Sequence, residues 1–364
     1  MDASFEYRFP AIRGIQSGRE YYISMCPLRL IPKLFVFDEA ELKPELRAQR
    51  VLNKSRVPGI AEYIVKNRTG YVFSAITASI DGGLHFEPLA DENSMSRLGL
   101  LRVEMNAKFI INDGQHRRAA IETALKADPS LGDETIAVVF FHDKGLARSQ
   151  QMFADLNMHA ARPSRSLGIL YDQRDDLALL TRKAIALTKS FRDMVEFERS
   201  ALAERSRKLF TLSAIYSANR ALMEGNTLAT PAEALNFIVE FWDAVGLQMK
   251  DWQSVQQGRQ SSGEMRRDFI HSHAIVLHAL GLVGRDLVVL YPNNWKSKLK
   301  GLRTIDWSRS NKKVWEGTAM IAGAISKTTA SVQLTANYIK KHLGVPLNRS
   351  GAAAAHKQNG KGSK

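Results

Sequence analysis

The amino-acid sequence predicts an α+β fold, with a mixed α/β domain at residues 1–165 and a mainly α-helical domain at residues 166–345. Before residue 165, short runs rich in β-branched and aromatic residues alternate with segments of helical periodicity. After it the strand-like runs nearly vanish, and Leu, Ile, Val and Ala recur at intervals of three and four residues. With 364 residues the chain is long enough to build two domains, each with its own hydrophobic core.

The N-terminal domain is predicted to alternate strands with helices. Most of the strand-like runs end at Gly, Pro, Asp or Asn, which favour turns, and they fall at residues 21–25, 34–37, 71–79, 98–103, 108–112 and 136–141. Helical spacing of apolar residues appears at 48–57, 58–67, 115–127 and 146–157.

The C-terminal domain is predicted to be built from long helices. Their apolar periodicity covers residues 167–187, 201–222, 231–245, 266–282 and 318–343. A break at 326–329 leaves open a helix-turn-helix in the last of them, although no glycine lies in that break. Residues 346–364 are predicted to be a disordered basic tail, because they are too polar to bury surface.

Composition excludes several classes of protein. No apolar run reaches the length of a membrane span, and the start of the chain lacks a secretory pattern, so we expect a cytoplasmic protein with no membrane partner. The single cysteine, Cys26, excludes an internal disulfide and a Cys-rich zinc site, and we expect it to be a buried apolar residue. His271, His273 and His278 do not converge on one helical face, so no metal site is expected.

The charge is strongly basic and unevenly distributed. The chain has 51 Lys and Arg against 37 Asp and Glu, a net charge of +14, and residues 291–364 alone hold 14 Lys and Arg against two acids. Such a field attracts polyanions, of which nucleic acid is the commonest, although a merely solvated basic face is the alternative. The residues predicted to contact DNA lie in the basic segment 291–315 and are Lys296, Lys298, Lys300, Arg303, Lys312 and Lys313.

Two further expectations concern basic segments. The three tryptophans of segment 291–315 are expected to build a small core more often than to stack on bases. A second candidate DNA contact is the stretch from Arg199 to Lys208, in which Arg205 and Lys208 are predicted to share one helical face.

The most specific motif is a predicted strand, turn and helix at residues 109–120. Asp113 is expected to cap the helix through its carboxylate, and Gly114 allows a ligand to approach the main chain. His116 and Arg117 add charge-assisted donors, with the Arg117 guanidinium expected to be exposed. These residue types suit a phosphate-binding turn, and the alternative is a plain cap followed by solvated arginines.

The run Asp113-Gly114-Gln115-His116-Arg117 resembles the signature of the DGQHR-domain proteins. A second element, residues 153–157 with the sequence Phe-Ala-Asp-Leu-Asn, agrees with it. Within that group the chain is similar to the DndB family, the regulatory members of bacterial DNA phosphorothioation gene clusters. The length, the order of the two domains and residues 207–212 also fit this family.

The resemblance implies a fold like those of ParB N-terminal and sulfiredoxin domains. Gly114 and Arg117 match the Gly-x-Arg-Arg turn of ParB-like domains, and Gly114, His116 and Arg117 match the Gly-Cys-His-Arg turn of sulfiredoxins. Gln115 takes the place of the reactive cysteine, which excludes sulfiredoxin chemistry. The resemblance implies that ATP, CTP or another nucleotide with Mg²⁺ binds at Asp113, Gly114, Gln115, His116, Arg117, Arg118 and Asn157.

Three hypotheses of function follow. The first is a DNA-binding regulator of a phosphorothioation gene cluster, a homo-oligomer that binds double-stranded DNA near its own promoter and has other phosphorothioation proteins as partners. The second is an ATP-hydrolysing or kinase-like enzyme of DNA sulfur modification, for which Asp113 and His116 are the catalytic candidates. The third is a scaffold for the modification machinery. The charge asymmetry favours the regulator.

Overall fold

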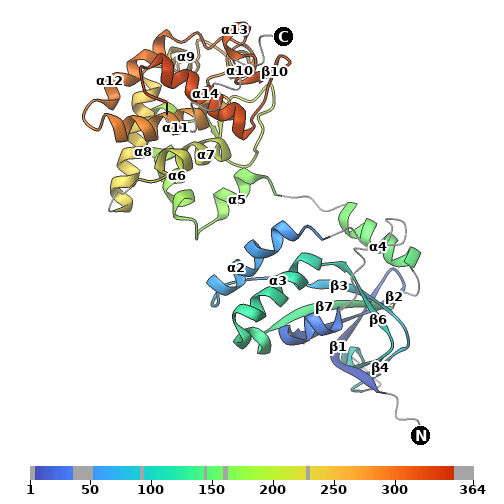
Figure 1. Cartoon of the computed structure of the whole chain (residues 1–364). Coiled ribbons are helices and arrows are strands. Elements are labelled where there is room, and N and C mark those ends of the chain that lie inside the picture. Colours follow the sequence, from blue (N-terminus) through green and yellow to red (C-terminus); the bar gives the residue numbers. More distant parts are fainter. Residues whose placement is uncertain are drawn as a thin grey trace, which may run out of the picture. The chain divides into compact units, whose positions relative to one another are not determined.

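The computed structural model describes residues 5–35, 52–90, 94–142, 146–158, 163–226 and 230–347. The chain divides into two compact units, residues 1–161 and 162–364, where the sequence predicted a boundary after residue 165 (Figure 1). The predicted α+β fold class is confirmed, because the first unit is built on one sheet and the second is mainly helical. Most of the predicted tail, from residue 348 onward, lies outside the described residues.

The first unit is built on a seven-stranded sheet. The strand order is β4-β5-β1-β2-β7-β3-β6, and β3 and β7 form the one parallel pair in it. The strands are β1 (Glu6–Gln16), β2 (Arg19–Pro27), β3 (Ile76–Asp81), β4 (Leu84–Pro88), β5 (Leu98–Glu104), β6 (Lys108–Asp113) and β7 (Thr135–His142). The sequence did not predict β1 and β4. The strand predicted at 34–37 is wrong at Leu34, which ends a helix, and residues 36–37 lie outside the described part.

Helices cover the two faces of this sheet unequally. The face that carries Ala78, Ile80 and Ile111 packs against α1 (Ile31–Leu34), α2 (Val57–Lys66) and α3 (Gln115–Ala127) in one buried core. Ser79 points to the other face, where its Oγ lies 3.9 Å from Met152 Sδ of α4 (Leu146–Met158). The predicted helix at 48–57 is replaced, where it is described, by a single 3-10 turn at Lys54–Arg56. The turn after β6 leads into α3 and therefore lies on the side of the sheet that α1, α2 and α3 cover.

The second unit packs its helices around α7 and α11. Its helices are α5 (Arg165–Tyr171), α6 (Asp176–Leu187), α7 (Leu212–Met223), α8 (Pro231–Gly246), α9 (Lys250–Gln256), α10 (Ser262–Asp268), α11 (Ala274–Leu290), α12 (Trp295–Leu299), α13 (Lys312–Trp315) and α14 (Thr329–His342). The backbones of α7 and α11 meet so closely that a Cβ on Gly281 would lie 2.2 Å from the Ala218 carbonyl oxygen. The buried Asn219 accepts from Trp242 Nε1 and donates to Thr181, which joins α6, α7 and α8.

Four predicted helices differ from the structure. Helix 167–187 is two helices, because Asp175 caps a new start with its carboxylate, and helix 266–282 is interrupted between α10 and α11. The helix predicted at 201–222 begins only at Leu212, so the placement of Arg205 and Lys208 on one helical face is wrong. The helix predicted at 318–343 begins at Thr329 after a two-stranded hairpin, which excludes the helix-turn-helix alternative.

A partly buried histidine, His278, makes the stability of the second unit dependent on pH. Burial lowers the pKa of His278 on α11 to about 4, and its Nδ1 has no hydrogen-bond partner among the described residues. The unfolded chain binds a proton at this side chain near its usual pKa of about 6.5. Between these two values the unfolded state holds more protons, so stability is full above pH 6.5 and falls as the pH falls toward 4.

We therefore predict that the free energy of unfolding falls by on the order of 2 kcal/mol through His278 between pH 6.5 and pH 4. Urea denaturation at several pH values measures this slope. His278→Gln is expected to flatten it, while His342→Gln, which changes an exposed histidine of α14, leaves it unchanged. Equal slopes in both variants would contradict the assignment.

Candidate functional site

The turn between β6 and α3 is formed around Gly114. This residue has a φ of +114°, a conformation that L side chains rarely adopt, and it begins α3 without a side-chain cap. A Cβ here would lie 3.0 Å from Ile76 Cγ1 and 3.1 Å from Arg117 Nη2. Gly114 thus packs closely against Ile76 and the Arg117 guanidinium, and a larger residue at this position would crowd both side chains.

Arg117 joins three segments at this turn. Its Nη2 donates to the Asp113 carboxylate at 2.7 Å and to the Ala75 carbonyl oxygen at 3.1 Å. Two predictions are corrected here. Asp113 does not cap α3, because it is the last residue of the β6 ladder, opposite Thr77, and its carboxylate is turned to Arg117. Nor is Arg117 an exposed guanidinium, because its side chain is only 20% exposed.

The other predicted residues of the motif lie around the first turns of α3. His116 is partly buried, and its Nε2 accepts a hydrogen bond from the Asn53 backbone N–H at 3.3 Å. Gln115, also partly buried, precedes it as the first residue of the helix. Arg118 donates to Glu122 and to the Pro32 carbonyl oxygen, along α3 and toward α1. Arg117 therefore lies beside Gly114, whereas the Arg118 side chain is directed along α3 and toward α1.

The second element of the resemblance lies on α4. Asn157 is the penultimate residue of this helix, and its side chain lies outside the described part. Asp155 accepts a hydrogen bond from Gln151 and shares a hollow with Arg19 at the start of β2. Through β7 and β3, β2 runs parallel to β6, so its first residue and Asp113 lie at opposite ends of the sheet. Among the described residues, the contacts of Asp155 are therefore with α4 and with the hollow beside β2, and none is with the turn.

Two buried polar residues position the turn, and sequence reasoning gave them no such role. The Asn112 side chain accepts from the Ser79 backbone N–H at 3.1 Å and donates to Ser79 Oγ at 3.0 Å. These bonds span β6 and β3 beside the irregularity between Thr77 and Ala78, which shifts the register just before Asp113. A buried Asn directly before the Asp-Gly pair is the only sequence signal for this role.

The net charge of the chain lies entirely on the second unit. Residues 1–161 contain 20 Lys and Arg and 20 Asp and Glu, whereas residues 162–364 contain 31 Lys and Arg and 17 Asp and Glu. The first unit is therefore neutral, and the second carries the whole formal charge of +14.

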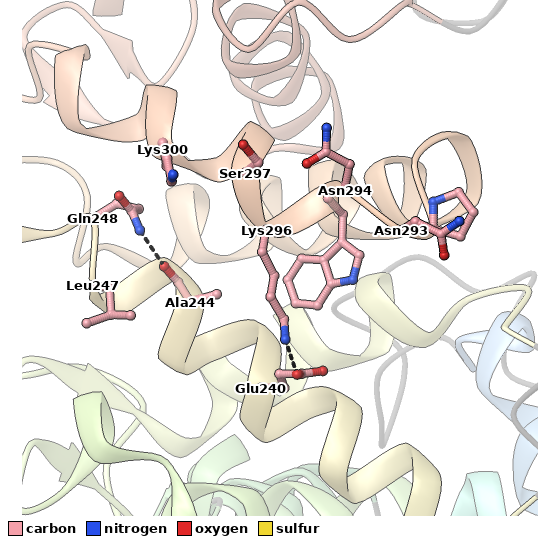
Figure 2. A pocket seen from close by; sticks show the side chains of 11 residues that line it. Glu240, Ala244, Leu247, Gln248, Asn293, Asn294, Lys296, Ser297 and Lys300 are labelled. Carbon is pink, nitrogen blue, oxygen red and sulfur yellow. Dashed lines mark hydrogen bonds and ion pairs between the residues drawn. The ribbon is translucent and has the colours of Figure 1, made fainter.

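The six predicted DNA contacts differ in how their charge is neutralised. Lys296 forms an ion pair with Glu240 of α8 across a hollow of about 640 Å³, as Figure 2 shows. Within the described ranges, no carboxylate lies within ion-pair distance of the other five, which are Lys298, Lys300, Arg303, Lys312 and Lys313. Lys298 Nζ lies 4.6 Å from the Tyr291 ring centroid, and Arg303 donates to the Leu247 carbonyl oxygen at 3.1 Å. The remaining three are exposed.

The basic segment 291–315 is not one patch. Its helices α12 and α13 lie well apart in the second unit, one bearing Lys296 and Lys298 and the other Lys312 and Lys313 (Figure 1). The expectation for its tryptophans is confirmed, since Trp295, Trp307 and Trp315 are all buried and the last two stack at 5.4 Å.

Cys26 and His271, two further residues singled out in the sequence, are both buried. Cys26 is completely buried, and burial raises the pKa of its thiol to about 11, so it is a protonated apolar side chain at neutral pH. His271 is buried against Phe269 and pairs with Asp251 at 2.8 Å. The described residues contain no group of three or more His, Cys, Asp or Glu able to hold a metal ion. In the same residues, no helix is long and apolar enough to cross a membrane.

We predict that Gly114→Ala destabilises the protein by about 1–3 kcal/mol, because the new Cβ meets Ile76 and Arg117 and the backbone conformation is strained. Gly59→Ala is the matched control, since Gly59 lies in α2 with nothing within 4 Å of an added Cβ. Thermal unfolding monitored by circular dichroism measures both. Equal melting temperatures for the two variants would show that the close contact at Gly114 is absent.

Residues 9–346 match the family model for DndB, described as DNA-sulfur modification-associated. No curated protein and no solved structure matches the chain.

Proposed function

We propose a regulatory, DNA-binding role from the premise that the chain belongs to the DndB family and takes part in DNA sulfur modification. In this proposal the chain binds double-stranded DNA at the promoter of the modification genes and controls their transcription. Homo-oligomerisation fits such a role, because symmetric operators are usually bound by dimers. Other phosphorothioation proteins are the further partners of this proposal.

The observation that carries the proposal is the charge of the second unit. All of the net charge of +14 lies there, and five of the six predicted contacts have no carboxylate partner in the described residues. An ammonium or guanidinium group that no carboxylate neutralises is free to displace counterions from DNA phosphates. Contacts of this kind set the position of a protein on DNA, and base contacts in addition would give it a specific operator.

Nucleotide binding at the turn is an accompanying proposal. Arg117 Nε is buried without a hydrogen-bond partner in the part of the chain that the structure describes. The Asp113 carboxylate that holds Nη2 is itself 50% exposed, and in this proposal an incoming phosphate takes its place at the guanidinium. ATP or CTP with Mg²⁺ is the ligand proposed here.

The regulatory proposal is tested by titrating the protein against DNA from upstream of its own gene and against an unrelated duplex of the same length and base composition. We expect tighter binding to the upstream DNA by at least about a hundredfold at physiological salt. The same samples, with and without ATP, are assayed for released phosphate. Equal affinity for both duplexes together with turnover of ATP would instead support the enzyme alternative, with Asp113 and His116 as its candidates.

We further predict that Lys300→Ala/Arg303→Ala and Lys312→Ala/Lys313→Ala each reduce affinity for both duplexes alike, because phosphate contacts carry no sequence information. The slope of log K against log salt should fall by about 2 in each double variant. Fluorescence anisotropy from 50 to 200 mM salt measures it. Lys66→Ala is the control, an exposed lysine paired with Glu62 in the neutral unit. Unchanged slopes would move the DNA contacts away from these residues.

For the turn, we predict that Arg117→Ala abolishes binding of ATP or CTP in isothermal titration calorimetry with Mg²⁺. The variant should also lose about 1–2 kcal/mol of stability, because its guanidinium joins Asp113 to the Ala75 carbonyl oxygen. Lys126→Ala, at the exposed end of the same helix, should bind nucleotide as the wild type does. If the wild type binds no nucleotide, the nucleotide proposal fails while the DNA proposal stands.

A further inference from the structure

We propose that the second unit contains a phosphate-binding hollow between residues 203–208 and the segment that connects α9 to α10. The hollow has a volume of about 700 Å³, within the range of ligand-binding pockets. Arg205 and Arg207 line one wall and Arg259 lines the other, with Met194 and Val255 among the apolar lining residues. This site is separate from segment 291–315, and nothing in the nucleotide proposal for the turn depends on it.

A single buried arginine fixes the wall formed by residues 203–208. Arg266 of α10 is 9% exposed, and its guanidinium donates to the carbonyl oxygens of Ala203, Glu204, Ser206 and Lys208. Ser262 Oγ adds a hydrogen bond to the Arg207 carbonyl oxygen at 2.7 Å. The main-chain oxygens of this segment are therefore directed to α10, and the side chains of Arg205 and Arg207 border the hollow.

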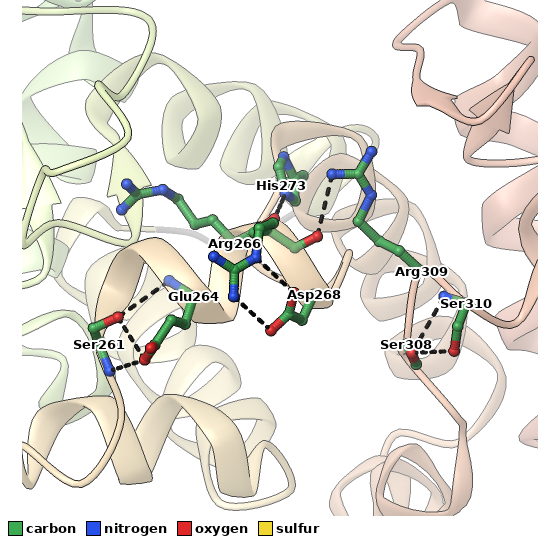
Figure 3. Close-up of polar contacts among 9 residues, drawn as sticks. Ser261, Glu264, Arg266, Asp268, His273, Ser308, Arg309 and Ser310 are labelled. Carbon is green, nitrogen blue, oxygen red and sulfur yellow. Dashed lines mark hydrogen bonds and ion pairs between the residues drawn. The ribbon is translucent and has the colours of Figure 1, made fainter.

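The opposite wall is also fixed by local contacts. Ser261 and Glu264 form a capping box at the start of α10, as Figure 3 shows. The backbone of Arg259 is held by the Ser254 carbonyl oxygen at 2.9 Å. A Cβ on Gly263 would lie 2.7 Å from the Glu204 carbonyl oxygen, so the two walls are in direct contact at their base. The cationic side chains are thus carried on a preorganised backbone, which lowers the entropic cost of binding.

Four arginines and three carboxylates line the hollow, so its lining carries a formal charge of +1. Within the described ranges, no carboxylate lies within ion-pair distance of Arg205, Arg207 or Arg259. Asp193, Glu204 and Glu264 are the acidic lining residues, and Glu264 is engaged by Ser261. Arg267, which also lines the hollow, pairs with Asp268.

Arg266 adds a further positive charge beneath the hollow. Burial lowers the pKa of this side chain, and its hydrogen-bond partners are neutral carbonyl groups. A buried cation that no carboxylate compensates favours an anion close by.

Phosphate is the anion that this arrangement fits best. Guanidinium groups bind phosphate oxygens in a bidentate manner, and three of them border one hollow of nucleotide size. The phosphate belongs either to a free nucleotide or to a DNA strand, and the two sources share the same contacts. Ser206 on the first wall offers an additional hydroxyl group.

The test uses the full chain with Arg117→Ala as background, so that the turn between β6 and α3 does not bind the probe. Inorganic pyrophosphate and ATP are titrated by calorimetry, and duplex DNA by anisotropy. We expect Arg205→Ala/Arg207→Ala and, separately, Arg259→Ala to weaken binding of at least one of these probes tenfold or more. Arg174→Ala is the matched control, because Arg174 is an exposed arginine that does not line the hollow and belongs to neither candidate DNA contact.

The outcomes separate the two sources of phosphate. Loss of pyrophosphate and ATP binding assigns the hollow to a free phosphate ligand. Loss confined to DNA assigns it to the DNA backbone. The proposal is overturned if every probe binds the hollow variants as it binds the background, or if Arg174→Ala causes the same loss. Arg259 lies on the other wall, so Arg259→Ala alone tests the proposal if the double variant does not fold. None of these results depends on the variants of segment 291–315.

Discussion

Uncompensated positive charge in the helical unit is the constraint on which the proposed function of this protein depends. The unit has only 17 Asp and Glu for its 31 Lys and Arg, and several of these carboxylates already form ion pairs within the unit. Asp286, for example, pairs with the buried Lys340, which joins α11 to α14. The cations left at the surface repel one another unless an external anion approaches. In the proposed function DNA is that anion, and counterion release supplies the free energy of the encounter.

The anion site proposed for the neutral unit is of a different kind. At the end of β6, Gly114 has a positive φ, and this conformation allows the Arg117 guanidinium to pack against the turn. Asn112 and Ser79 fix the register of the two strands beneath it. The unit therefore holds a single arginine in a defined geometry, where the helical unit offers many cations over a broad surface. A defined site suits a small phosphate ligand, and a broad surface suits a polymer.

The sequence predicted the fold class and the motif but not their detail. Strand β1 was not predicted from the sequence because Pro10 and Gly14 interrupt its pattern. The pairing with β2 begins only at Ala11, so the missing N–H of Pro10 removes no hydrogen bond from that ladder. Helix periodicity over 201–222 was misleading, because Arg266, about 60 residues later, binds the carbonyl oxygens of residues 203–208 and holds them out of a helix. The role of Asp113 depended on Ala75 and Arg117 meeting across the turn. Contacts between residues so distant in sequence leave no local signal.

Hydrogen–deuterium exchange of the full chain, with and without saturating duplex DNA, tests most directly whether DNA binds the helical unit. The charge distribution predicts slower exchange in residues 291–315, with no change across the sheet of the first unit. Protection confined to residues 5–158, with segment 291–315 unaffected, would contradict it.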